Sequence, residues 1–174
     1  MATWFTPLRI GRFVAVAAAV AVVAAGCGGS SSRSTAPKGG VAGAQHATTA
    51  ATVQTRRIKN LGVVLVNSRG LTLYMFVRDH QKRVTCKSTA CVTVWPPLKL
   101  KTGQKPTAGG LARKSLLGSD KNPRGGRVVT YNDWPLYRYY LDKKPGQAKG
   151  QATNLNGGLW YVLSPKGKII KTKP

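Results

Sequence analysis

An internal repeat is the feature of this chain that most restricts its fold. Residues 73–79 read Leu-Tyr-Met-Phe-Val-Arg-Asp and residues 136–142 read Leu-Tyr-Arg-Tyr-Tyr-Leu-Asp. Leucine, tyrosine, a second aromatic residue and aspartate thus recur at identical spacing. Recurrence of this kind indicates that one supersecondary unit occurs twice in the chain.

Three hairpins are predicted from short β-branched and aromatic runs that turn residues separate. The paired runs are residues 61–66 with 71–77, 127–131 with 136–141, and 159–163 with 168–171. The turn-rich segments 99–126 and 143–158 are expected to be surface loops. The sequence therefore predicts an all-β fold. It is a small antiparallel domain in residues 58–174, built from two pseudo-repeated hairpin units plus a C-terminal hairpin.

The aromatic residues of the repeat occupy alternating strand positions. Because residues two apart share a face of a strand, Tyr74 would pair with Phe76, and Tyr137 with Tyr139. Such rings could form a groove that stacks sugars, bases or a planar cofactor. Aromatics at alternating positions more often pack inward, so we expect a compact aromatic core.

The aspartate of each copy, Asp79 or Asp142, falls off the aromatic face. We interpret both as turn residues that cap backbone N–H groups after the strand. Catalytic acids or metal ligands are the alternative, but a catalytic pair need not recur at one strand position in two repeats.

The N-terminal segment has the layout of an export signal. Arg9 and Arg12 precede a small apolar run over residues 13–25, which is shorter than the 20 or so residues that span a bilayer. Small residues lead to Cys27, which glycines and serines follow. Residues 1–26 are therefore predicted to be a lipoprotein signal peptide, with Cys27 as the acylated N-terminus, for example by palmitate. A plain secretory signal or an anchor helix is the alternative.

Residues 27–57 are mostly Gly, Ser, Ala, Thr and Gln and show no apolar period. This composition is typical of a flexible tether. The sequence thus predicts a domain that is lipid-anchored at the outer face of the cytoplasmic membrane and stands clear of the headgroups.

The remaining cysteines, Cys86 and Cys91, form an even pair. Disulfides persist outside the cytoplasm, so a bridge between the two is expected. A metal or redox site is the rival interpretation, although a lone cysteine pair lacks the second pair of ligands that zinc sites use.

The chain has 28 Lys and Arg against 4 acidic residues, with a formal net charge of +24. Such a charge favours polyanionic partners. Anionic wall polymers and lipid headgroups are the candidates, and nucleic acid ranks last because the protein is exported. A solvated basic surface without a partner is the alternative, because the charges are dispersed.

The same composition leaves little for catalysis, since all four acidic residues are Asp and the histidines are His46 and His80. A Ser-His-Asp site would need His80, and no nucleophile-elbow sequence supports it. We expect a protein that is not an enzyme and that holds no cofactor or metal.

These motifs together make the chain resemble the bacterial secreted-repeat lipoproteins named for a Tyr-x-(Phe/Trp/Tyr)-x-x-Asp motif, at residues 74–79 and 137–142. The resemblance extends to Cys86, Cys91 and residues 95–98, 129–132, 134–137, 145–146 and 160–161. The cysteines have one more intervening residue than is usual there. Asp133 stands where the family often has glycine, and must adopt a left-handed turn conformation. The resemblance implies tandem β repeats on a lipid-anchored secreted protein of unestablished activity.

The leading hypothesis is a non-enzymatic envelope protein that binds an anionic surface component through its dispersed Lys and Arg. The alternative is a redox protein, or a carrier of a ligand or metal, that uses Cys86, Cys91 and His80.

Overall fold

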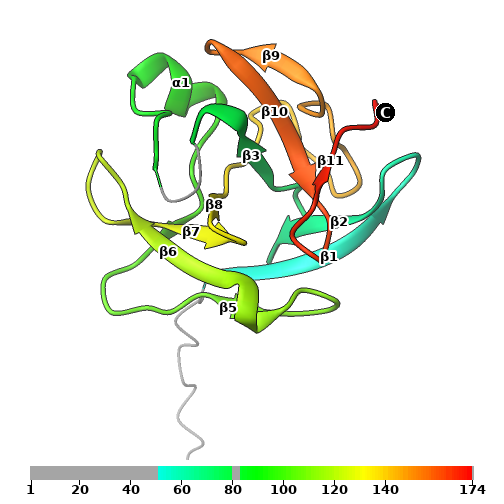
Figure 1. The fold of residues 1–174 in the computed structure, drawn as a ribbon, viewed down its shortest axis with the longest axis horizontal. Coiled ribbons are helices and arrows are strands. Elements are labelled where there is room, and N and C mark those ends of the chain that lie inside the picture. The colour runs from blue at the N-terminus through cyan, green and yellow to red at the C-terminus, as the bar shows by residue number, and fades with distance from the viewer. Residues whose placement is uncertain (1–50, 80–82, 174) are drawn as a thin grey trace, which may run out of the picture. The chain divides into compact units, whose positions relative to one another are not determined.

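The computed structural model of the protein describes residues 51–79 and 83–173 (Figure 1). The predicted signal peptide, Cys27, His46, His80 and residues 27–50 of the predicted tether lie outside these residues. Within them, no helix has both the length and the apolar character needed to cross a membrane.

The first sheet has the order β2-β1-β5. Strands β1 (Thr52–Ile58) and β2 (Gly62–Asn67) form an antiparallel hairpin, and β5 (Thr107–Ala108) runs parallel to β1. Strand β1 begins inside the segment predicted to be tether. Its valine, threonines and isoleucine favour a strand, and Val53 is fully buried. The folded domain therefore starts before residue 58, which is the boundary expected from composition alone.

The second sheet has the order β11-β10-β3, with β9 on the edge of β10. Its strands are β3 (Tyr74–Phe76), β9 (Thr153–Leu155), β10 (Gly158–Leu163) and β11 (Ile169–Ile170). The β10–β11 hairpin confirms the predicted C-terminal hairpin. Strand β9 lies in a segment that was predicted to be a loop, and that prediction was wrong for its three residues.

The third sheet has the order β4-β7-β6, with β8 paired to β7. Its strands are β4 (Lys99–Leu100), β6 (Leu117–Lys121), β7 (Arg127–Tyr131) and β8 (Trp134–Pro135). Strands β4, β5 and β6 correct the prediction that residues 99–126 are all loop. Strand β6 carries Gly, Ser and Asp, which are poor strand formers, and its ladder with β7 overrides that preference.

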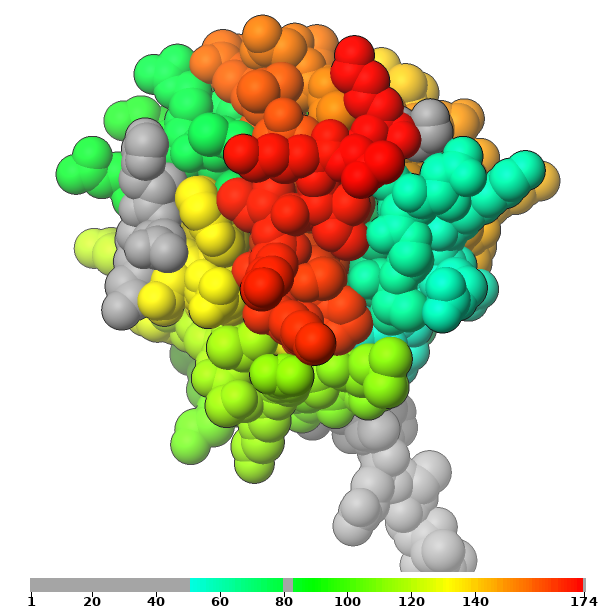
Figure 2. Space-filling view, turned by 45° about the vertical axis from the view of Figure 1, so that its right-hand side comes forward, coloured from blue at the N-terminus to red at the C-terminus, as the bar shows by residue number. Residues whose placement is uncertain are grey.

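The turn between β7 and β8 has the backbone that its sequence predicts. Asn132 has a φ of 49° and Asp133 a φ of 64°, the left-handed pair of a tight hairpin turn. The turn at residues 164–167 packs against the turn between β7 and β8. The Asn132 side-chain amide joins the two turns by donating to the Gly167 carbonyl at 3.1 Å. Figure 2 shows the C-terminal segment, in red, between the yellow residues of this turn region and the cyan β1–β2 hairpin.

Two of the predicted hairpins are only partly formed. The turn after β2 closes with a hydrogen bond from the Gly70 N–H to the Asn67 carbonyl at 2.9 Å, but β3 then leaves β2 and pairs with β10. Residues 136–141 are not a strand. Tyr137 instead makes isolated bridges to Tyr74 and to Pro97. Each motif segment therefore pairs with a segment distant in sequence, and not with the strand that precedes it in the predicted hairpin.

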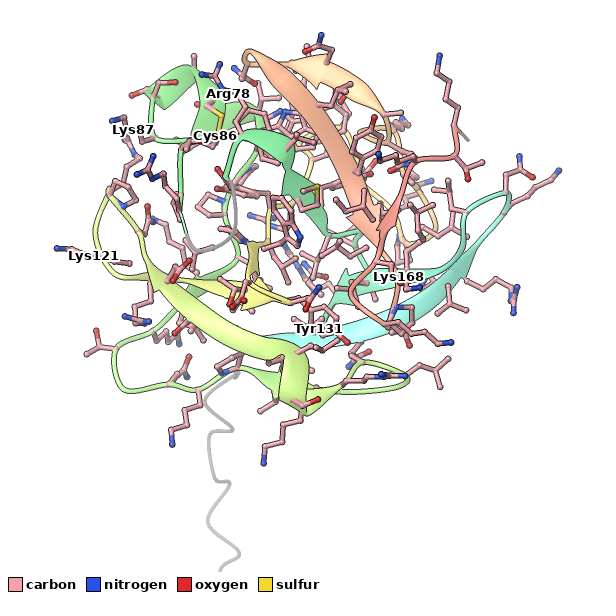
Figure 3. The ribbon with its side chains drawn as sticks, viewed as in Figure 1. Arg78, Cys86, Lys87, Lys121, Tyr131 and Lys168 are labelled. Carbon is pink, nitrogen blue, oxygen red and sulfur yellow. A yellow bond between two sulfur atoms is a disulfide. The ribbon has the colours of Figure 1, made fainter. Side chains whose placement is uncertain are left out.

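A disulfide joins Cys86 to Cys91, which lies within helix α1 (Thr89–Val94) (Figure 3). The Ser88 hydroxyl caps the helix by accepting from the Cys91 N–H at 3.2 Å. Two single 3-10 turns complete the domain, η1 (Val77–Asp79) and η2 (Lys114–Leu116). The predicted bridge is thus present.

Candidate functional site

The two copies of the repeat motif are joined by crossed hydrogen bonds. The Tyr74 hydroxyl donates to Asp142 Oδ2 at 2.6 Å, and the Tyr137 hydroxyl donates to Asp79 Oδ2 at 2.7 Å. The backbones cross in the same way, because the Tyr74 N–H donates to the Tyr137 carbonyl at 2.8 Å and the Tyr137 N–H returns a bond of 2.9 Å. The tyrosine of each copy therefore binds the aspartate of the other copy.

The second oxygen of each carboxylate accepts from the chain that follows it. Asp79 Oδ1 accepts from the N–H of Thr85 at 2.8 Å and from its hydroxyl at 2.7 Å. Asp142 Oδ1 accepts from the Lys149 N–H at 3.0 Å. The predicted role as a cap of backbone N–H groups is thus present on one oxygen of each aspartate. The tyrosine partners on the other oxygen were not predicted.

Burial shifts the pKa of every group in this network. It raises the pKa of Tyr74 and of Tyr137 far above the ordinary value of 10.0, and the negative charge of the aspartate partner raises each further. It also raises the pKa of Asp79 and of Asp142, although the hydrogen bonds that each carboxylate accepts partly offset the rise. The tyrosines therefore remain hydrogen-bond donors throughout the physiological pH range.

Four aromatic rings form a continuous stack beside this network, in the order Phe76, Trp160, Trp95 and Tyr139. Successive ring centroids lie 4.1, 3.9 and 4.4 Å apart. The motif tyrosines meet the stack edge-on: Tyr74 contacts Trp95 at 5.4 Å, and its counterpart in the second copy contacts Trp160 at 5.2 Å. Aromatic pairs prefer these offset and edge-on geometries.

This stack corrects the predicted ring pairs. The ring of Tyr74 contacts Tyr139 of the other copy at 6.3 Å, and Tyr139 in turn contacts its chain neighbour Tyr140 at 5.2 Å. Every ring of the stack is buried, so the rings form core and offer no face to a ligand. The prediction of a compact aromatic core is confirmed.

The cysteine pair lies in the same core. Cys86 is 2% exposed and Cys91 is 4% exposed. Across residues 51–79 and 83–173, no group of three or more His, Cys, Asp or Glu side chains is placed to hold a metal ion.

The surface of the domain, in contrast, carries the positive charge. The Lys and Arg side chains described are exposed, with the exception of the half-buried Arg138. Figure 3 shows Lys87 and Lys121 extending outward from the ribbon. Two of the four acidic side chains, Asp79 and Asp142, are buried in the core. The surface charge is therefore more one-sided than the composition alone indicates.

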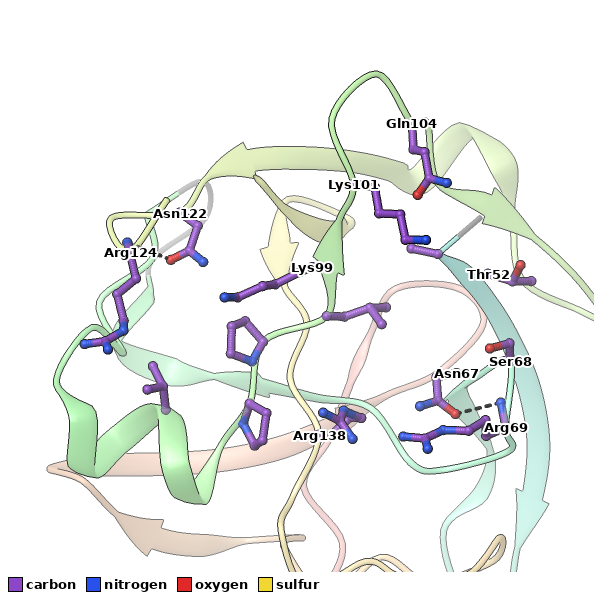
Figure 4. A pocket seen from close by; sticks show the side chains of 15 residues that line it. Thr52, Asn67, Ser68, Arg69, Lys99, Lys101, Gln104, Asn122, Arg124 and Arg138 are labelled. Carbon is purple, nitrogen blue, oxygen red and sulfur yellow. Dashed lines mark hydrogen bonds between the residues drawn. The ribbon is translucent and has the colours of Figure 1, made fainter. Parts of the chain in front are cut away.

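Five of these cations meet around one pocket of about 570 Å³, which we call the basic pocket (Figure 4). None of the described residues that line it is acidic. Its cations are Arg69, Lys99, Lys101, Arg124 and Arg138.

Four separate segments bring these cations together. The turn at residues 67–70 presents Arg69, whose N–H donates to Asn67 Oδ1 at 2.9 Å. Lys99 lies in β4 and Lys101 follows it. Arg124 lies in the β6–β7 turn. The last cation, Arg138, is placed by a hydrogen bond from its N–H to the Pro96 carbonyl at 2.9 Å.

Sequence reasoning missed this pocket, because the cations become neighbours only after the sheets assemble. The sequence does contain one indication that Arg138 faces away from the aromatic core. Arg138 lies between Tyr137 and Tyr139, which are expected in the core, so the strand predicted for residues 136–141 would put Arg138 on the opposite face. Its counterpart in the first copy is the fully buried Met75, so the two repeats differ at this position.

Comparison with known proteins gives a family but no individual relative. A family model described as a secreted repeat of unknown function matches residues 55–99 and residues 118–164, and each match contains one copy of the motif. No curated protein and no solved structure matches the chain. The description indicates a protein that is exported from the cytoplasm. Because the two matches cover just over half of the chain, the protein belongs to this family of secreted repeats.

Proposed function

We propose that the protein is a non-enzymatic component of the cell envelope. A lipid on Cys27 holds it at the outer face of the cytoplasmic membrane, and its basic surface binds an anionic polymer of the envelope. The segment from Cys27 to the start of β1 serves as the tether that lets the domain reach wall material.

The one-sided surface charge carries this proposal. The chain has 28 basic residues against 4 acidic ones, and burial of Asp79 and Asp142 removes two of those carboxylates from the surface. A polymer with repeated phosphates gains a favourable contact at each exposed Lys or Arg that it meets. Many such contacts together give appreciable affinity and a strong dependence on salt.

The position of the repeat motif supports a role without catalysis. A catalytic acid must reach a substrate, whereas Asp79 and Asp142 are buried and hydrogen-bonded to buried tyrosines. The motif holds the two repeats together. Its recurrence in the two repeats of this chain is then explained by the fold rather than by a reaction.

The alternative of a redox protein or carrier has weaker support. Its sulfur atoms, those of Cys86 and Cys91, are joined in a bridge and buried, so a partner protein has little access to them.

Sedimentation with cell wall tests the proposal. The full-length protein in neutral detergent is mixed with insoluble wall that carries phosphate polymer, and the fraction that sediments is measured as salt increases. We expect retention at low salt and progressive loss at higher salt, and no retention on wall stripped of the polymer. Absence of retention at low ionic strength would contradict the proposal.

Two matched variants test whether retention on cell wall depends on positive charge. Lys143 and Lys144 are exposed. The variant Lys143→Gln/Lys144→Gln should weaken retention, while Lys143→Arg/Lys144→Arg should retain it, because only the first removes charge. Equal retention by both would argue against electrostatic binding.

A further inference from the structure

We propose that the basic pocket is a discrete site for the phosphate group of a polyol or sugar phosphate, bound by Lys99, Arg138 and the side-chain amide of Asn122. This inference deepens the proposed function and rests on it only for the source of the ligand. A dispersed surface attracts a polymer as a whole, whereas a pocket recognises one unit of it.

The first argument is an unbalanced cluster of positive charge. In Figure 4 the Arg69 side chain points toward Arg138. Burial lowers the pKa of the Arg138 guanidinium, and the charge of Arg69 lowers it further. Arginine nevertheless stays protonated in proteins, so the two like charges persist. A phosphate bound to Arg138 would offset this repulsion, and guanidinium matches the geometry of phosphate.

The second argument is a buried donor without a partner. Asn122 is 2% exposed, and its Nδ2 atom has no hydrogen-bond partner within the described structure. Its Oδ1 atom already accepts from the Arg124 N–H at 3.1 Å, which fixes the orientation of the amide. Leaving a buried donor unpaired costs about 1–3 kcal/mol, so such atoms call for an explanation.

A bound phosphate would supply the missing acceptor, and Figure 4 shows where it would lie. The Asn122 amide nitrogen and the Lys99 ammonium group point toward the same space in the pocket. A phosphate oxygen placed there would accept from both. The donor set contains charged and neutral groups, as is common where proteins orient a phosphate rather than merely attract it.

The third argument concerns the rest of the ligand. The pocket volume of about 570 Å³ exceeds what one phosphate fills, and it falls within the 300–1,000 Å³ or so of small-molecule sites. Val92, Pro96, Pro97 and Leu98 supply an apolar lining beside the cations. The carbon skeleton of a polyol or sugar could pack against that lining while its phosphate meets the charges.

The fourth argument concerns the source. Ala51 and Thr52 line the pocket, so it lies beside the first residues that the structure describes. Two sources offer the same chemistry at this place: a soluble or polymeric glycerol phosphate of the wall, and the glycerol phosphate headgroup of an anionic lipid.

Titration calorimetry with glycerol 3-phosphate tests the site. The full-length protein is reconstituted in phosphatidylcholine vesicles at low salt, and glycerol serves as the neutral probe. We expect saturable binding of glycerol 3-phosphate and none of glycerol. The double variant Lys99→Gln/Lys101→Gln keeps the half-buried Arg138 intact. It should weaken binding by about tenfold or more, because hydrogen bonds to charged groups are worth that much.

The matched control is Lys166→Gln/Lys168→Gln, which removes the same charge from the exposed β10–β11 turn, outside the pocket. It should leave the affinity for glycerol 3-phosphate within about twofold, since neither lysine lines the pocket and both double variants lower the net charge equally. Asn122→Ala tests the uncharged donor, and it should weaken binding at unchanged net charge. If the alanine variant does not fold, Asn122→Asp retains the acceptor for the Arg124 N–H but replaces the donor by a negative charge, and it should weaken binding further.

Equal losses in the pocket variant and the control variant would overturn the site, as would failure of glycerol 3-phosphate to bind. Either result can coexist with retention on cell wall, so the site and the proposed function can fail separately. Addition of phosphatidylglycerol to the vesicles then identifies the source. If it blocks binding of glycerol 3-phosphate, the lipid headgroup occupies the site; if it does not, the wall polymer is the source.

Discussion

Tyr74 and Asp142 belong to different copies of the repeat, yet the hydroxyl of one donates to the carboxylate of the other at 2.6 Å in the buried core. The reciprocal bond joins Tyr137 to Asp79. The repeated motif of this chain thus joins two repeats into one domain. Neither repeat can complete its own hydrogen bonds, so each depends on the other for its fold.

Removal of one tyrosine hydroxyl should destabilise the whole domain. Tyr74→Phe and Tyr137→Phe keep the ring contacts but leave a buried carboxylate with one hydrogen bond fewer. We expect each to lower the free energy of unfolding by about 1–3 kcal/mol in urea denaturation. Tyr140→Phe is the control, because Tyr140 is 44% exposed. Effects no larger than that of the control would show that the crossed bonds contribute little.

Stability should fall in alkali. The folded pKa of Tyr74 and of Tyr137 lies above the ordinary value of 10.0, so ionisation favours the unfolded chain. Their contribution is complete below about pH 10 and is lost as pH rises above it, at up to 1.4 kcal/mol or so per pH unit for each group. Urea titrations between about pH 8 and pH 11 would measure this slope. The Tyr74→Phe/Tyr137→Phe variant should show a shallower slope, and an unchanged slope would contradict the assignment.

The aromatic stack leaves no room beside Gly150. A Cβ atom there would lie 2.7 Å from the nearest atom of the Trp95 ring. Gly150→Ala should therefore destabilise the domain by about 1–3 kcal/mol through overpacking. Gly109→Ala is the matched control, since its Cβ would meet only the flexible Gln54 side chain, at 3.2 Å. Thermal unfolding of both variants checks the prediction, which fails if they unfold at the same temperature.

The disulfide should stabilise the domain without taking part in binding. Its short loop predicts a loss of about 2 kcal/mol in Cys86→Ser/Cys91→Ser on the loop-entropy model. Retention on cell wall should not change at temperatures where the variant is folded. Loss of a bound species, detected by native mass spectrometry, would instead favour the redox or carrier alternative.

Local sequence signals were enough for the parts of the fold that local chemistry controls. The turn at Asn132 and Asp133 follows from residues that tolerate a left-handed backbone, and the C-terminal hairpin follows from two apolar runs around Pro165 and Gly167. The inward-facing aromatics were also predicted. In each case the residues that determine the structure are close together in the chain.

Long-range pairing was not predictable in the same way. Strand β3 resembles the second half of a hairpin with β2, but Trp160 pairs with Phe76 and draws it into another sheet. The basic pocket is a more extreme case, because its cations come from four segments. The sequence of either segment alone does not predict that Arg69 and Arg138 line the same pocket.

A double-mutant cycle measures the central relationship most directly. The free energy of unfolding is determined for Tyr74→Phe, Asp142→Ala and their combination, and likewise with Asp79→Ala in place of Asp142→Ala. The account predicts a coupling of about 1 kcal/mol or more between Tyr74 and Asp142, and below about 0.5 kcal/mol between Tyr74 and Asp79. Variants that remain folded should still bind cell wall. Stronger coupling within one copy of the motif, or loss of wall binding by a folded variant, would contradict the account.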